Sequence, residues 1–260
     1  MAWLASLPGW LLVIASIAIF TGAAFLGRKM MEKVSRDHPR ENHHVVAGQL
    51  MPGLCAIFGI IAGLTLISQV DNWNKAQDAV AREASASARL AWATADAPAD
   101  QGHIPLRRFL DTDRSVGWEL TLDDSLPEPL AKSIQKLESG VRQAAKAPGT
   151  STPQASEMLA ALDDLTTARR ERVTAQSDHL PDMFLFALFL AGLAVVVNAA
   201  ALTVGRPQTW RLIVLLVAVV AVDIALVIAL WLPLSGAIQV SDQPLADIVR
   251  QLQDGVFVLR

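Results

Sequence analysis

The sequence predicts an all-α, polytopic membrane protein with four transmembrane helices and a helical extramembrane stalk or bundle between the second and third. A transmembrane helix needs roughly 20 predominantly apolar residues to cross a hydrocarbon core ~30 Å thick. Four stretches approach or exceed that length: residues 9–27, 45–70, 183–204 and 212–234. The polar segment between the second and third stretches shows helical windows and no convincing strand alternation. A chain that is 52% hydrophobic and 18% charged fits this division between lipid and water.

The first stretch is expected to be a retained helix. A signal peptide carries its positive charge before the apolar run, whereas here the basic residues follow it: Arg28, Lys29, Lys33, Arg36 and Arg40. Basic loops stay on the cytoplasmic side, so residues 28–44 are expected to face the cytoplasm. The N-terminus, the central segment and the C-terminus are then extracytoplasmic, on a multi-pass protein of the bacterial cytoplasmic (inner) membrane.

The second helix is expected to continue beyond the membrane to about residue 96, because no Gly or Pro follows Val70 before Pro98. Mostly small residues recur along it at spacings of four and three: Trp73, Gln77, Val80, Ala84, Ser87 and Ala91. Such a seam favours close contact between helices.

Prolines punctuate the rest of the central segment, and helices are expected at about 106–122, 129–146 and 154–179. The chain therefore divides into a first transmembrane helix pair with its basic loop 28–44 (1–70), a helical extramembrane domain (71–180), a second transmembrane helix pair (181–236) and a C-terminal tail (237–260). The tail is expected to hold a short amphipathic helix, whose apolar face lies on the membrane surface or packs on the stalk. That face comprises Leu245, Ile248, Val249 and Leu252.

Asp223 is the one charged residue within the four apolar stretches, near the middle of the last. A carboxylate at mid-bilayer costs roughly 2.5–3.5 kcal/mol on insertion scales and persists where it faces protein, water or a partner. Two interpretations stay open: a pore or proton-path residue, grouped with Ser16 and Asn198, or a protonated Asp hydrogen-bonded to a neighbouring helix. Asn198 alone is also explained as a hydrogen-bonding residue between helices.

Small residues predict helix packing at four positions: Gly59, Gly63, Gly192 and Ala84. The first two form a GxxxG pair, which lets helices approach closely within or between subunits. Three arginines before the third stretch are candidates for contact with lipid phosphates, or for pairing with nearby acids: Arg169, Arg170 and Arg172.

Several segments carry a family resemblance: NHHVVAGQL before the second span, Trp73 after it, AVAREA, LDDLTTARRERVTAQSDHLP and LPLSGAIQVSDQPL. Together they resemble the bacterial bestrophin-like membrane protein family, a domain of unknown function. Members usually carry an Asp where this chain has Trp231, and many carry a Glu-Trp pair where this chain has Trp118-Glu119. The family name implies a channel.

The sequence excludes several classes of function. A net charge of −3 argues against nucleic acid as a partner. His38, His43 and His44 lack companions at metal-ligand spacing, and Cys55 is expected to pack as a small side chain. No catalytic or phosphate-binding motif is found, so no enzyme activity, cofactor or metal is expected.

Two functions remain open. The first is a homo-oligomeric membrane protein that conducts ions. The second is a non-transporting accessory subunit or envelope sensor that acts through protein–protein contacts in a larger membrane complex. Membrane lipids are partners in both.

Overall fold

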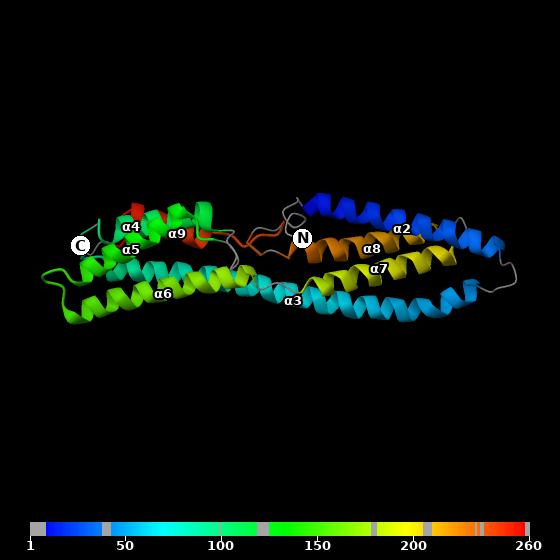
Figure 1. Ribbon diagram of the computed structural model, residues 1–260, viewed down its shortest axis with the longest axis horizontal. Helices are drawn as coiled ribbons and strands as arrows, with labels where there is room; N and C mark the ends of the chain where they lie inside the picture. Colours follow the sequence, from blue (N-terminus) through cyan, green and yellow to red (C-terminus); the bar gives the residue numbers. More distant parts are fainter. Residues whose placement is uncertain are drawn as a thin grey trace. The chain divides into compact units, whose positions relative to one another are not determined.

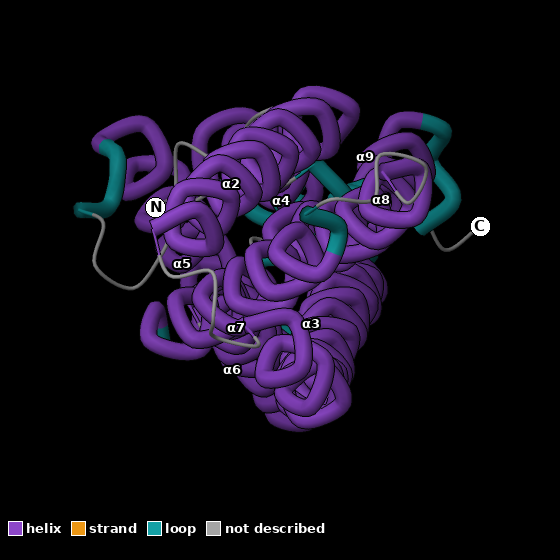
Figure 2. The backbone as a smooth tube through the Cα atoms, turned by 90° about the vertical axis from the view of Figure 1, so that its right-hand side faces the viewer, coloured by secondary structure: helices purple, strands orange, loops and turns teal. Residues whose placement is uncertain are grey.

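The computed structural model describes residues 9–37, 43–98, 100–118, 125–177, 181–204, 210–231, 233–234 and 237–257. Every regular element in these ranges is helical, as Figure 2 shows. In chain order they are α2 (Gly9–Asp37), α3 (His43–Ala93), α4 (His103–Thr112), the π-helical turn η1 (Asp113–Gly117), α5 (Glu128–Ala145), α6 (Thr152–Ser177), α7 (Asp182–Leu202), α8 (Trp210–Ala229) and α9 (Gln243–Gln253). The all-α prediction is confirmed.

The chain divides into two compact units. The membrane unit comprises residues 1–71 and 179–238, and the extramembrane unit comprises residues 72–178 and 239–260. Four helices are long and apolar enough to cross a membrane, and they are supplied by α2, α3, α7 and α8. The predicted number of transmembrane helices is confirmed.

The membrane unit is held together by α2, which packs along both α7 and α8 (Figure 1). Its core is apolar, and Phe20, Leu188 and Val196 have no exposed surface. Small residues allow the close approaches. A Cβ added to Gly27 would lie 3.0 Å from Val197 Cγ1, so a larger residue there would require Val197 on α7 to shift.

The extramembrane unit joins the second part of α3 to α4, η1, α5, α6 and α9 around one core. Leu106, Leu130 and Leu245 are fully buried there and come from α4, α5 and α9. The helix expected at 129–146 is α5, and the one expected at 154–179 is α6. The window 106–122 corresponds to α4 and η1, and its residues from 119 lie outside the described ranges.

The tail helix α9 packs on the bundle, which was one of its two predicted positions. Leu245, Ile248 and Val249 are buried in the extramembrane core. The ring of Phe257, just beyond the helix, meets that of Trp92 edge-on at 5.3 Å between centroids. Because the apolar face of α9 packs on the extramembrane core, it cannot also lie on the membrane surface.

Helix α3 ends at Ala93, close to the expected residue 96. The seam predicted along it is wrong in one respect: Gln77 is exposed, whereas Ala76, Ala79 and Glu83 are buried. The buried face is therefore rotated toward these three residues, and it includes a carboxyl group.

Candidate functional site

The polar residues predicted for a pore occupy different settings in the membrane unit. Ser16 is buried on α2, and Asp223 is partly exposed on α8. The Nδ2 atom of Asn198 donates to the carbonyl oxygen of Ala47 at 2.9 Å, which joins α7 to α3. The amide of Asn198 therefore serves helix packing in this structure.

The four small residues predicted to pack between helices also occupy different settings: two are closely packed within the chain and two are exposed. A Cβ at Gly192 would lie 2.9 Å from Val220 Cγ1, so α7 and α8 are closely packed there, and Ala84 is buried in the extramembrane core. Gly59 and Gly63 are exposed, and a Cβ on either would meet no heavy atom within 4 Å. The GxxxG pair therefore packs against no described residue of its own chain.

Among the described residues, a cluster of buried charges lies in the extramembrane unit and begins where α3 runs beside α6 (Figure 1). The Nε atom of Arg172 on α6 donates to Glu83 Oε2 on α3 at 2.6 Å, and both side chains are completely buried. One residue earlier on each helix, Arg82 and Glu171 form a parallel pair at 2.9 Å that is exposed. The same two helices thus hold one dry and one solvated ion pair side by side.

The turn η1 supplies the remaining groups. A π-helical turn carries an extra residue per turn and often marks a functional position. Asp113 in η1 is fully buried, and its two oxygens accept from Arg172 Nη2 and, at 3.0 Å, from Arg169 Nε. The Nη1 atom of Arg172 donates to the carbonyl oxygen of Trp118 at 3.2 Å, and its guanidinium lies 5.1 Å from that indole ring.

Glycine at position 117 makes room for this arrangement. A Cβ there would lie 2.7 Å from Leu130 Cδ2 and would also collide with the carboxylate of Asp113. We call the four charged residues around it the buried ion network: Glu83, Asp113, Arg169 and Arg172.

Removal from water dominates the electrostatics of the network. Burial raises the pKa of Glu83 to about 7, although Arg172 acts in the opposite direction. Desolvation lowers the pKa of Arg172, but the carboxylates of Glu83 and Asp113 outweigh this effect and leave it raised. Glu83 Oε1 has no hydrogen-bond partner among the described residues. The network therefore combines a permanent guanidinium charge with a carboxyl group that exchanges a proton near neutral pH.

The structure gives the three arginines separate roles. Arg172 has no exposed side-chain surface, so contact with a lipid phosphate is wrong for this residue. Arg169 is mostly buried and pairs with Asp113, whereas Arg170 is exposed. The predicted alternative, pairing with acids, describes Arg169 and Arg172. The acids that they pair with come from α3 and η1.

Sequence reasoning missed Glu83 and Asp113. Glu83 lies in the AVAREA segment and recurs with Ala76, Val80, Ser87 and Leu90 at spacings of four and three. A carboxylate at that period, within a run of small residues, is the signal that could have revealed it. Asp113 has no such signal, because it is one of several acids around α4.

No group of three or more His, Cys, Asp or Glu side chains in the described parts of the chain is placed to hold a metal ion. His38, Arg40 and Glu119 lie outside the described residues. Cys55 is exposed on α3.

Comparison with known proteins gives the family. The family model described as the Bestrophin-like domain matches residues 18–245. The crystal structure of a bacterial Bestrophin homolog from Klebsiella pneumoniae, solved with a point mutation, superposes with a TM-score of 0.66. It shares 14% sequence identity, and the match covers 93% of this chain and 99% of that one. No functionally curated protein matches the sequence. The family match spans most of the chain, and we conclude that this membrane protein belongs to the Bestrophin-like family.

Proposed function

We propose that the protein is a homo-oligomer of the bacterial inner membrane that conducts ions, and that the exposed face of α3 forms the contact between copies. One observation carries the proposal: Gly59 and Gly63 are both exposed and contact no described side chain or helix of their own chain. Glycines spaced four apart leave a groove into which the backbone of another helix fits.

The burial of the spans supports the same assignment. Only 11% of the apolar window of α3 is buried within the chain, against 22% for α2 and 44% for α8. Large apolar side chains of the same span are also exposed: Ile57, Ile60, Leu64 and Ile67. In lipid the exposed apolar surface itself gives no driving force, so packing around the glycines would supply the association energy.

Conduction is the second element of the proposal. The Bestrophin-like family name implies a channel, and the fold resembles that of a bacterial Bestrophin homolog. Asp223 is the residue we assign to the conduction path, whereas Ser16 is buried within its own chain. A partly exposed carboxyl group on a transmembrane helix needs water or another subunit beside it, and a pore between copies would provide both.

The orientation follows the distribution of basic residues. We place residues 28–44 in the cytoplasm, with the N-terminus, the extramembrane unit and the C-terminus on the other side of the membrane. The buried ion network would then lie in the extracytoplasmic compartment, where the pH follows that of the surroundings.

A second candidate function is a non-transporting envelope sensor, and the buried ion network is the observation that favours it. A carboxyl group with a pKa of about 7 in a closed ion cluster responds to small changes in external pH. No ion flux is required for that response.

Two measurements test the proposal. Light scattering of the purified protein in detergent gives the number of copies per particle, and more than one copy is expected. Flux through liposomes that contain the protein then separates the two functions: a channel dissipates an ion gradient, whereas a sensor leaves it intact. A monodisperse monomer would overturn the homo-oligomer.

A further inference from the structure

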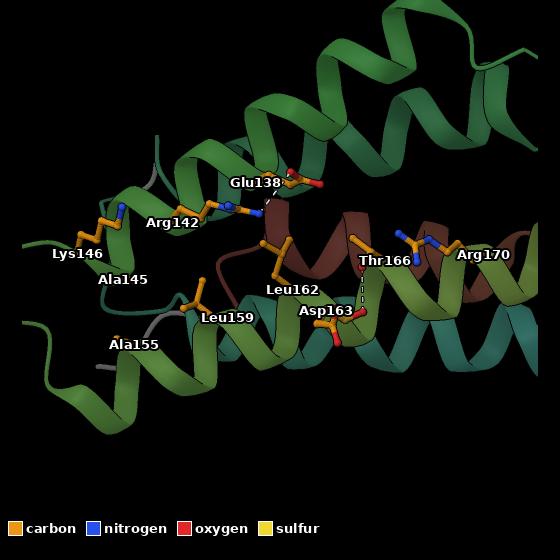
Figure 3. Close-up of a pocket in the computed structure, with 10 residues that line it drawn as sticks. All are labelled: Glu138, Arg142, Ala145, Lys146, Ala155, Leu159, Leu162, Asp163, Thr166 and Arg170. Atoms are coloured by element: carbon orange, nitrogen blue, oxygen red, sulfur yellow. Dashed lines mark hydrogen bonds and ion pairs between the residues drawn. The ribbon is translucent and has the colours of Figure 1, made fainter.

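A groove runs between α5 and α6 in the extramembrane unit, as Figure 3 shows. Its wide part has a volume of about 560 Å³. Leu162 projects from α6 toward α5 in the middle of it, with Arg142 on the facing helix and Lys146 just beyond its end. A smaller cavity of about 140 Å³ reaches inward to α4 and shares four lining residues with the groove: Glu138, Leu162, Thr166 and Arg170.

The walls of the inner cavity are mainly apolar, and they come from three helices. The apolar lining residues are Phe109, Ile134, Leu137, Leu162 and Leu165. An engineered cavity of about 150 Å³ with leucine, isoleucine and phenylalanine walls stays dry and binds benzene. The inner cavity is therefore the right size for one small ring or a short alkyl chain.

The mostly buried guanidinium of Arg169 borders this apolar space. The Nε atom of Arg169 donates to Asp113 Oδ1 at 3.0 Å, but its Nη2 atom is buried and has no hydrogen-bond partner among the described residues. Asp113 does not supply that partner, because its Oδ1 accepts from Arg169 Nε, its Oδ2 accepts from Arg172 Nη2, and neither oxygen accepts from Arg169 Nη2. A buried charged donor without an acceptor is destabilising, so an acceptor brought by a ligand would relieve this cost.

We propose that the inner cavity binds a small monocarboxylate with an apolar body, which places its carboxylate on Arg169 and its body among the apolar side chains. A guanidinium matches the two oxygens of a carboxylate. Glu138 also lines the cavity, so an anion with one negative charge fits better than one with two. Arg170 and Glu138 line both the groove and the inner cavity, so the shared part carries one positive and one negative side chain.

The test uses para-fluorobenzoate and the full-length protein in detergent, with binding followed by fluorine NMR. The uncharged para-fluorobenzyl alcohol has the same ring and serves as the matched probe for entry into apolar space or the micelle. The carboxylate should bind at least about tenfold more tightly than the alcohol, because it alone forms a charge-assisted hydrogen bond with Arg169.

Three variants locate the site. Arg169→Gln should reduce the affinity for the carboxylate by about tenfold and leave that for the alcohol unchanged. Arg142→Gln removes the same charge from the wide part of the groove only and should have little effect. Ile134→Phe should fill the cavity and abolish binding of both probes.

Equal affinity of the wild type for the two probes would overturn the proposal, and so would equal losses in Arg169→Gln and Arg142→Gln. Binding that survives Ile134→Phe would indicate partition into the micelle and would also overturn it. If Arg169→Gln does not fold, the two probes on the wild type and on Ile134→Phe still decide the question.

Discussion

Replacing Glu83 by Gln should remove a pH dependence from the stability of the protein. The amide has the size of the carboxyl group, and its oxygen can still accept from Arg172 Nε, but it does not titrate. Glu171→Gln is the matched control. Glu171 on α6 forms an exposed ion pair with Arg82 on α3, beside the buried pair of Glu83 and Arg172.

The magnitude follows from the pKa of Glu83, which burial raises from 4.5 to about 7. The folded state therefore binds this proton more tightly than the unfolded state does. The resulting contribution to the free energy of unfolding is complete below pH 4.5 and is lost as the pH rises to about 7. At 1.36 kcal/mol per pKa unit, the loss amounts to roughly 3 kcal/mol.

The assay is thermal unfolding in detergent, followed by circular dichroism, for the wild type and both variants across this pH range. For a chain of this size, 3 kcal/mol corresponds to roughly 6–12 °C in Tm. The difference in Tm between Glu83→Gln and the wild type should grow by that amount from pH 4.5 to 7.5 in favour of the variant, because other titrating groups cancel in the comparison. A difference that does not change with pH, or an equal change in Glu171→Gln, would refute the assignment of the proton to Glu83.

Three further predictions test other parts of the structure. Arg172→Met should lower the free energy of unfolding by roughly 3–5 kcal/mol, since it leaves two buried carboxylates without their main partner. The control Arg82→Met should lower it by less than about 1 kcal/mol. Equal losses of the two variants in denaturant titrations would contradict the burial of the network. Gly59→Leu should lower the oligomeric mass measured by light scattering, because it fills the groove on α3, and an unchanged mass would place the contact elsewhere. In a cysteine-free background, Ser139→Cys should react with an impermeant reagent on intact cells and Arg36→Cys only after permeabilisation, and the reverse pattern would invert the orientation.

The helices of this fold could be predicted because local chemistry determines them. A span must satisfy its backbone within lipid, so about 20 apolar residues identify it without knowledge of its neighbours. Proline at position 129 near the start of α5 and the Pro148-Gly149 pair after its end marked that helix in the same local way. The sequence did not distinguish the two possible positions of α9, because its apolar face can pack on either a membrane surface or a protein core.

The buried ion network could not be predicted from local patterns. Arg172 is 89 residues from Glu83 and 59 from Asp113, so the three meet only when α3, η1 and α6 assemble. Asp163, Asp164 and Glu171 lie nearer to Arg169 in the sequence, but these three acids are exposed. The seam on α3 was misplaced at Gln77 because small residues lie on several faces of that helix, and only tertiary packing selects one.

Ion flux through liposomes that contain only the purified protein tests the central claim most directly. The wild type should dissipate an imposed ion gradient, and Asp223→Asn should keep the fold while it changes the flux or its dependence on pH between about 5 and 8. If the role of Asp223 is purely structural, Asp223→Leu should lower Tm, whereas Asp223→Asn should leave both Tm and flux unchanged. Absence of flux from wild-type protein under every gradient tested would contradict the channel and leave the envelope sensor as the better account.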